Sequence, residues 1–440
     1  MTDLARFVDT SPMIDTHEHL LPEARFVTEG PDVLQHLFDS YVMHDLRSAG
    51  ATEDQVKALL YSRKVSVTER FKPIEPAWQR CRHTGYGQAV RIMAERLFGM
   101  DEITPNAIET AEARNAELRT PGGRLRVLRD MARLDHVQID NFAVPAPDES
   151  GPSFFLYDLS WVGFANGQID ATQIEKRCGE GVRDLPSLRR AIEATFARYA
   201  PLAIAVKTQH AYSRTLAWRE RDDAAAAAVL ERSLRGDKLG TDDQLCLGDW
   251  CLARGVEQAI EHELRVKIHT GYYAGNGYMG ARFGIDGIRA GQLAPLLAKY
   301  PAARFVLMHM AYPFDDELVA IAKHYPNVVV DLCWAWSIAP DAAAAFVRRM
   351  IHAVPSNKLF AFGGDTGWPG SSLAYSIQAR QWLTRALQAE VDERLLTEAE
   401  AIELARRMML DNQRDVFDID TTRSANERAL VSQRQPAAAI

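Results

Sequence analysis

The sequence predicts an α/β protein, a (β/α)8 TIM barrel with a helical insertion after the first strand. Short apolar or β-branched runs alternate with helix-like stretches along the 440 residues, an order typical of parallel strands joined by helices. No G-x-G-x-x-G pattern follows a candidate strand, so a dinucleotide-binding sheet is not indicated. A chain of this length fits one large barrel with an elaborated connection.

The candidate strands are short, and some are apolar throughout, as in FVLMH and NVVVDL. Continuous apolar runs are typical of strands that are buried on both faces of a sheet. We expect eight strands, over Met13–Asp15, His136–Val144, Phe154–Trp161, Leu202–Thr208, Arg265–Thr270, Arg304–His309, Asn327–Cys333 and Lys358–Gly363.

Residues 1–420 are expected to form a single barrel unit, in which residues 20–134 are a mostly helical insertion over the barrel mouth. This stretch is too long for one loop, and its charged helical patterns are unlike those of a linker. After Ile419 the sequence is polar and lacks periodicity, so residues 421–440 are expected to be a frayed polar tail.

Composition and charge exclude several classes of protein. The chain is 47% hydrophobic and 25% charged, which is ordinary globular composition and excludes a disordered chain. Its net charge of −8 argues against nucleic acid or an anionic membrane as a partner. No apolar run is long enough to span a bilayer, the N-terminus lacks a signal-peptide pattern, and the five cysteines are scattered. We therefore expect a cytoplasmic protein that binds a small molecule; self-association into a homo-oligomer stays open.

The most informative local pattern is Ile14-Asp15-Thr16-His17-Glu18-His19 at the end of the first candidate strand. Strand side chains alternate with a period of two, so His17 and His19 lie on the same side. Two neutral imidazoles on one side can hold a divalent metal ion. Alone, the pattern is weak, because two histidines at this spacing also occur by chance.

Polar residues at the ends of other candidate strands strengthen the metal interpretation. The fourth, fifth, sixth and eighth strands end near Lys207, His269, His309 and Asp365. In a barrel the C-terminal strand ends face one cup, where active sites form. Burying these groups without partners would be costly, and a divalent cation would meet that need.

The order H-x-H, Lys, His, His, Asp on these strands resembles the amidohydrolase superfamily, most closely its amidohydrolase-related branch. The motifs IDTHEHL, VKTQHAYSRTL, KIHTGYYAGNG, VLMHMAYPF, NVVVDLCWAW and KLFAFGGDTGWPG carry the resemblance, which runs from about Met13 to Asn412. They are particularly similar to uronate isomerase-like members and to the amidohydrolase domain fused to glutamine synthetase. The set of strand-end residues is specific, whereas each single motif is not.

The resemblance implies a metal-dependent barrel enzyme with one or two divalent ions, most simply Zn²⁺. It implies that His17, His19, His269 and Asp365 bind metal and that Asp365 also moves protons. It implies that His309 polarises the substrate or assists at a second metal.

Lys207 has three interpretations, and the metal count depends on them. In two-metal members a lysine at this position is carboxylated and bridges the ions. An unmodified Lys207 could instead bind a substrate carboxylate, or it could be a lysine that snorkels at the barrel rim.

Candidate substrate-binding residues lie in the insertion and after later strands: Arg82, Tyr86, Arg214, Tyr272 and Trp334. Arginine forks suit carboxylates. A surface salt bridge or a helix terminus explains each arginine equally well. Asp331, at the end of the seventh strand, could orient a ligating histidine or cap a turn.

The expected function is metal-dependent hydrolysis of a small carboxylate-bearing substrate, in which the metal activates water. Asp365 would take the remaining proton and deliver it to the leaving group. His309 would polarise the carbonyl or hydrogen-bond the developing oxyanion. A uronate isomerase or a non-oxidative decarboxylase could use the same site. A catalytically inactive binding barrel is the alternative from another class.

Overall fold

The computed structural model describes residues 1–145, 153–274 and 285–434. Eight parallel strands pair in sequence order, β1 to β8, which confirms the predicted (β/α)8 fold. The strands are β1 Met13–Glu18, β2 Leu134–Ile139, β3 Phe155–Ser160, β4 Ala203–Thr208, β5 Arg265–His269, β6 Phe305–Met308, β7 Val328–Asp331 and β8 Leu359–Phe360.

Backbone hydrogen bonds between β1 and the segment after β8 close the ring. Thr16 N donates to Phe362 O at 3.1 Å, and Asp365 N donates to His17 O at 2.8 Å. These bonds are irregular, so β8 has two residues where the sequence predicted six. The residues after Phe360 still line β1, and they carry Asp365 to the same strand end as His17.

Helices surround the sheet, and their starts follow from capping residues. Asp184, for example, accepts from the backbone N–H of Ser187 in a capping box that begins α13. The helices of this part are α1 Asp3–Thr10, α11 Val162–Ala165, α12 Ala171–Cys178, α13 Leu185–Tyr199, α14 Asp223–Leu234, α15 Thr241–Glu261, α16 Ala294–Lys299, α17 Asp315–His324, α18 Ala335–Ile338, α19 Pro340–Ala353, α20 Pro369–Asp392, α21 Glu398–Arg406, α22 Asn412–Phe417 and α23 Ile419–Arg434.

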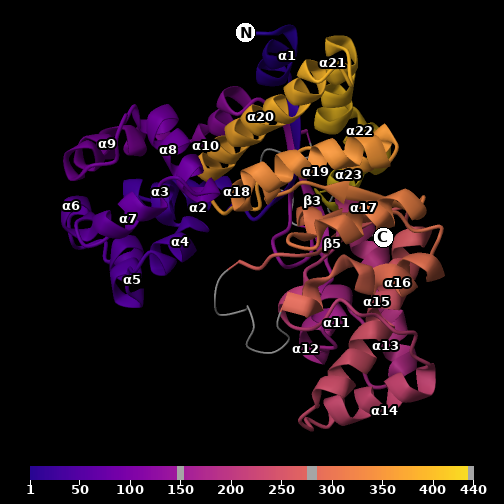
Figure 1. Ribbon diagram of the computed structural model, residues 1–440. Coiled ribbons are helices and arrows are strands. Elements are labelled where there is room, and N and C mark those ends of the chain that lie inside the picture. The colour runs from indigo at the N-terminus through magenta and orange to yellow at the C-terminus, as the bar shows by residue number, and fades with distance from the viewer. Residues whose placement is uncertain (146–152, 275–284, 435–440) are drawn as a thin grey trace.

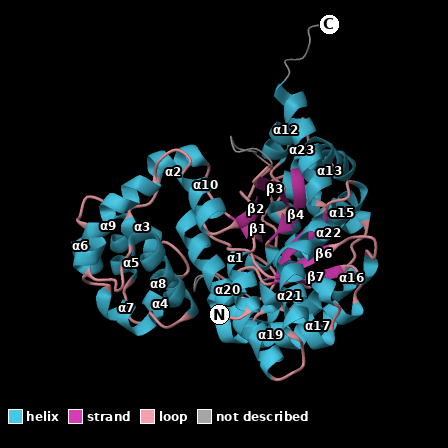
Figure 2. Ribbon diagram, turned by 90° about the horizontal axis from the view of Figure 1, so that it is seen from above, coloured by secondary structure: helices cyan, strands magenta, loops and turns pink. Residues whose placement is uncertain are grey.

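The segment between β1 and β2 is helical, and its helices α2 to α9 form a lobe beside the barrel (Figures 1 and 2). The lobe has an aromatic core of its own, where the Phe38 ring lies 5.8 Å from Phe71 and 5.5 Å from Trp78. The helices of the segment are α2 Glu23–Glu29, α3 Val33–Phe38, α4 Val42–Ser48, α5 Glu53–Tyr61, α6 Val67–Phe71, α7 Glu75–Cys81, α8 Gly85–Phe98, α9 Pro105–Leu118 and α10 Gly123–Leu125.

The lobe joins the barrel where α8 packs on α18 and α20. Gln378 Nε2 of α20 donates to Gly85 O at 2.8 Å, and Ser337 Oγ of α18 donates to Gln378 Oε1 at 2.8 Å. A second junction lies at the strand ends, where Tyr41 OH donates to Asp365 O at 2.7 Å. The lobe thus stands at the side of the barrel and reaches its mouth through Tyr41.

The C-terminal segment differs from the expected frayed tail as far as Arg434, because residues Ile419–Arg434 form α23. Its polar side chains bond to the barrel: Asn426 Nδ2 donates to Pro201 O at 2.7 Å, and Arg423 pairs with Asp135 at 3.2 Å. The polar side chains of α23 bind backbone carbonyls and charged side chains of the barrel. A search for hydrophobic periodicity does not detect a helix held by such contacts. In the described part of the chain, no helix combines the length and apolarity needed to cross a membrane.

Substitution of Gly85 tests the junction between lobe and barrel. A Cβ at this position would lie 2.2 Å from Ser337 O, a backbone atom. We expect Gly85→Ala to lower the free energy of unfolding by about 1–3 kcal/mol, the usual cost of overpacking. Urea denaturation measures this change.

Gly163→Ala is the matched control, because the nearest atom to its Cβ would be Gln168 O at 3.9 Å. We expect that variant to be as stable as the parent or slightly more so. Equal stability of the two variants would contradict the close junction at Gly85.

Candidate metal centre

The strand ends bring together the polar residues that the sequence singled out. Each of the side chains lies at or just beyond the C-terminal end of a strand, and all are buried or nearly so: His17, His19, Lys207, His269, His309 and Asp365. Period-two alternation on β1 points His17 and His19 the same way, as predicted. The cup contains nitrogen donors, one carboxylate and one ammonium.

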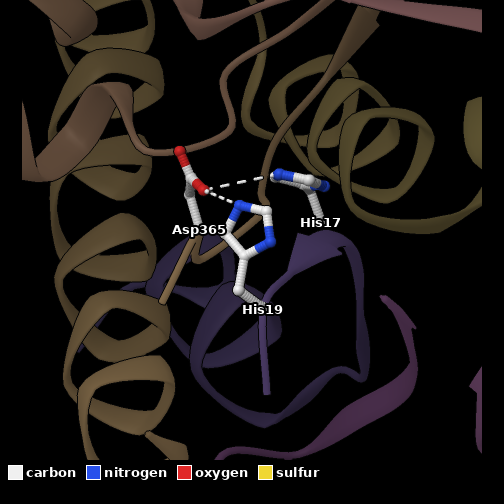
Figure 3. Close-up of side chains that lie close together, drawn as sticks. All are labelled: His17, His19 and Asp365. Carbon is white, nitrogen blue, oxygen red and sulfur yellow. Dashed lines mark ion pairs between the residues drawn. The ribbon is translucent and has the colours of Figure 1, made fainter. Parts of the chain in front are cut away.

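Two imidazoles converge on one carboxylate oxygen (Figure 3). Asp365 Oδ1 lies 3.4 Å from His17 Nε2 and 3.1 Å from His19 Nε2. The ligand atoms of these three residues lie within 4.8 Å of one another. His309 Nε2 approaches the other oxygen, Asp365 Oδ2, at 3.9 Å. This spacing suits a group of ligands that share one cation.

Backbone carbonyls orient two of the imidazoles. His19 Nδ1 lies 2.6 Å from Asp140 O, and His309 Nδ1 lies 3.0 Å from Cys333 O. A carbonyl oxygen can only accept, so Nδ1 carries the proton in both rings and Nε2 of the neutral ring keeps its lone pair. Both lone pairs point into the cup, which is the arrangement a metal ion needs.

Unpaired buried nitrogens test whether a cation fits. Three of these nitrogens are buried and make no hydrogen bond with any described residue: His17 Nδ1, His17 Nε2 and His309 Nε2. Burial, assisted by the charge of Lys207, lowers the pKa of His17 well below its usual value. Burial likewise lowers the pKa of His309 to about 4. A neutral imidazole whose unprotonated nitrogen faces a carboxylate can share a divalent cation with that carboxylate. The residues present therefore fit a divalent metal ion.

Asp365 is held as the anion of this group. Burial raises its pKa, but the close imidazoles of His17 and His19 outweigh burial and hold the pKa well below its usual range. Its backbone adopts φ 56°, a left-handed conformation that is uncommon for residues other than glycine, although aspartate and asparagine tolerate it better than most. Local strain of this kind clusters at functional sites.

His269 and Lys207 lie beside the cluster and face other atoms. The His269 ring centre is 4.3 Å from that of His309, yet His269 Nε2 bonds to Tyr272 O at 2.9 Å. Since the carbonyl accepts, Nδ1 is the nitrogen of His269 with a free lone pair. Lys207 is fully buried, and its Nζ has one long contact, 3.5 Å, to Gln209 Oε1.

A pocket of about 380 Å³ opens onto His19 and Asp365. Rings form much of its wall, and the Phe142 ring stacks on His19 at 4.4 Å. The other lining residues are Tyr41, Val162, Gln209, Tyr212, Ser213 and Ala274. The pocket can thus hold a small molecule against the histidine–carboxylate cluster.

Three predicted substrate-binding residues lie next to pocket residue Tyr41 or next to His309 and Trp334, but they are not among the residues that line the pocket. The Trp334 ring is 5.6 Å from His309 and 4.3 Å from Tyr41. Tyr86 is buried against the same ring at 6.4 Å, and Tyr272 lies 5.8 Å from it. Tyr41, which lines the pocket, was not predicted from the sequence. Packing of the lobe brings it to the pocket, and no local sequence motif indicates that position.

The two predicted arginines lie elsewhere. Arg214 is buried and directs its guanidinium at Asp249 Oδ1, 2.5 Å, and at the carbonyls of Ala165 and Ala217. Arg82 lines a separate cavity of about 200 Å³ with Trp78 and other lobe residues. Neither arginine lines the pocket beside His19, because helix packing rather than sequence position sets their direction.

A buried ion pair lies beneath the cluster of histidines and Asp365, and it was not predicted from the sequence. Lys267 and Asp158 are fully buried, and Lys267 Nζ contacts both carboxylate oxygens at 2.9 Å. Burial raises the pKa of Asp158 to about 6, although the charge of Lys267 opposes the rise. Lys267 precedes His269 by two positions, so strand alternation could have placed both inside the barrel.

Asp15 and Glu18, both on β1, form a second buried acidic pair. Glu18 Oε2 accepts from the backbone and side chain of Thr366, and Asp15 Oδ2 accepts from Ser372. Burial raises the pKa of both acids, that of Asp15 to about 6. Their partners belong to the segment after β8, so the pair fixes that segment against β1.

Comparisons with known proteins support the fold over most of the chain. The chain resembles a glucuronate isomerase from Caulobacter crescentus, with a TM-score of 0.76, 18% identity and coverage of 95% of this chain and 93% of that one. A uronate isomerase from Thermotoga maritima gives 0.74 and 17%, covering 94% and 96%. A protein described as a metal-dependent hydrolase from Lactobacillus casei gives 0.66 and 15%, covering 96% and 99%.

Sequence comparison gives the family. Protein fluG of Emericella nidulans is 27% identical over 129 residues, which are 29% of this chain and 15% of that protein. The chain therefore matches a small part of this relative's length. The amidohydrolase family model matches residues 175–417, more than half of the chain, including Lys207, His269, His309 and Asp365. The chain belongs to the amidohydrolase family.

Proposed function

We propose that this protein is a metal-dependent hydrolase that acts on a small carboxylate-bearing substrate. The observation that carries the proposal is the convergence of His17 Nε2 and His19 Nε2 on Asp365 Oδ1, at 3.4 and 3.1 Å. Family membership supports an enzyme at this place, since barrel active sites form at the C-terminal strand ends.

His17, His19 and Asp365 would hold the cation, with His269 as the fourth proposed ligand through Nδ1. Two or three imidazoles with one carboxylate suit Zn²⁺, which prefers nitrogen donors and low coordination numbers. When bound, the ion would act as a Lewis acid and lower the pKa of water, so that hydroxide is available near neutral pH.

The remaining steps belong to side chains. Asp365 Oδ2 takes a proton from the attacking water and passes it to the leaving group. His309 Nε2 lies 3.9 Å from that oxygen and, in the neutral ring, is an acceptor. We therefore assign His309 to orienting the water, in place of the oxyanion donor role expected from the sequence, unless a second ion takes His309 as its ligand.

Lys207 is proposed to bind the substrate carboxylate. Its ammonium is fully buried and has, among the described residues, a single long hydrogen-bond contact, to Gln209, which itself lines the pocket. Burial of a charge with so few polar partners costs free energy, and an anionic substrate group beside it would offset that cost. Carboxylation of Lys207 and a two-ion site is the alternative that metal counting distinguishes.

A uronate isomerase is the second candidate. Two solved uronate isomerases match at least 94% of this chain, so the fold similarity includes the helical lobe as well as the barrel.

We also propose that residues 20–134 act with the barrel as one catalytic unit, through Tyr41. Scattered, unpaired cysteines support a cytoplasmic location.

Removal of both β1 histidines tests the metal site. We expect the purified wild-type protein to contain one to two equivalents of divalent metal, and His17→Ala/His19→Ala to contain less than about a tenth of that. The fold should persist, because barrel stability depends on its layered core. Elemental analysis with circular dichroism measures both. Equal metal in the two proteins would contradict the assignment.

Turnover in ¹⁸O-labelled water separates hydrolysis from isomerisation and decarboxylation. A panel of lactones, amides, uronates and aromatic acids identifies a substrate first. We expect one labelled oxygen per turnover in the acid that is released, because water supplies the new carboxyl oxygen. A product carboxylate without label would exclude hydrolysis and favour the isomerase.

A further inference from the structure

The buried pair of Lys267 and Asp158 lies directly under His17. Lys267 Nζ uses all three of its hydrogens, donating to Asp158 Oδ1, Asp158 Oδ2 and Thr16 O, each at 2.9 Å. Asp158 Oδ2 in turn lies 4.0 Å from His17 Nδ1. The pair therefore approaches His17 at two points. Asp158 faces the His17 ring, and Lys267 binds the carbonyl of Thr16, the residue before His17.

Two of the three imidazoles nearest Asp365 share one pattern. His19 Nδ1 faces the carbonyl of Asp140, and His309 Nδ1 faces the carbonyl of Cys333. His17 Nδ1 has no hydrogen-bond partner, and among the described residues the acceptor that faces it is the Asp158 carboxylate. A ligating imidazole almost always directs its second nitrogen at an acceptor of this kind.

Stability alone does not account for the pair. Both side chains are fully buried in a barrel interior that apolar side chains usually fill. Removing two charges from water costs several kcal/mol for each ion, and apolar replacement of a buried pair is often neutral or stabilising. A role in holding His17 gives a reason for the ions to be there.

We infer that Lys267 and Asp158 are positioning residues for His17. Asp158 selects the ring state in which Nδ1 carries the proton, so Nε2 presents its lone pair toward Asp365. Lys267 fixes the direction of the Asp158 carboxylate and anchors the backbone of β1 at Thr16. The inference rests on the proposed metal site, and neither residue is placed against the substrate.

The test replaces the whole pair and measures binding of the metal alone. Lys267→Met by itself would leave an uncompensated buried carboxylate and could unfold the chain. Lys267→Met/Asp158→Leu removes both charges and keeps apolar volume. Full-length protein stripped of metal is titrated with Zn²⁺ against a chromophoric chelator, and urea denaturation monitors the fold.

We expect the double variant to fold and to bind Zn²⁺ about 10- to 100-fold more weakly than the wild type, the usual effect of removing such support. The absorption spectrum of the Co²⁺-loaded variant should also change, since it reports ligand geometry. Unchanged Zn²⁺ affinity and Co²⁺ spectrum in a folded double variant would overturn the inference. Absence of Zn²⁺ binding by the wild type would instead overturn the proposed metal site.

Arg70→Met/Asp32→Asn is the matched control. Arg70 and Asp32 form a mostly buried ion pair in the helical lobe, where Arg70 also donates to Leu59 O. Its removal should lower stability and leave Zn²⁺ affinity unchanged. A similar loss of affinity in this control would show that general destabilisation explains the effect.

A measurement on the wild type keeps the inference testable if the double variant fails to fold. ¹⁵N NMR of histidine-labelled protein without metal, assigned with His17→Gln, reports which ring nitrogen of His17 is protonated. We expect Nδ1 to carry the proton. A proton on Nε2 would contradict the role of Asp158.

Discussion

The closure of the barrel between β1 and the segment after β8 brings the two halves of the site together. Asp365 N donates to His17 O at 2.8 Å, and His19 N donates to Thr366 O at 2.9 Å. These bonds place the carboxylate and the imidazoles, which belong to opposite ends of the chain, on one rim. The left-handed backbone of Asp365 and the Tyr41 hydrogen bond to its carbonyl depend on the same closure.

Below this rim, several buried charged side chains have specific polar partners. Lys267 meets Asp158, and the acidic pair of Asp15 and Glu18 is held by Thr366 and Ser372. The nitrogens of His17 and His309 that face Asp365 have no hydrogen-bond partner among the described residues, and both lie beside one carboxylate. Unsatisfied nitrogens that gather around one buried carboxylate indicate a place where a cation can bind.

Sequence patterns predicted the barrel and the strand-end residues because both depend on local periodicity. Apolar runs located all eight strands, and strand alternation placed His17 beside His19. The directions of Arg82 and Arg214 depend on helix packing, which has no local signal, and both lie away from the pocket. Tyr41 was missed for the same reason, and α23 was missed because its contacts with the barrel are polar.

Anomalous diffraction at the zinc absorption edge, from crystals grown with Zn²⁺, shows whether the strand-end histidines and Asp365 bind the metal. We predict that the strongest anomalous peak lies among His17, His19 and Asp365, with the Asp158 carboxylate on the far side of the His17 ring. A strongest peak elsewhere in the molecule, or a zinc-bound crystal with no peak at these residues, would contradict it.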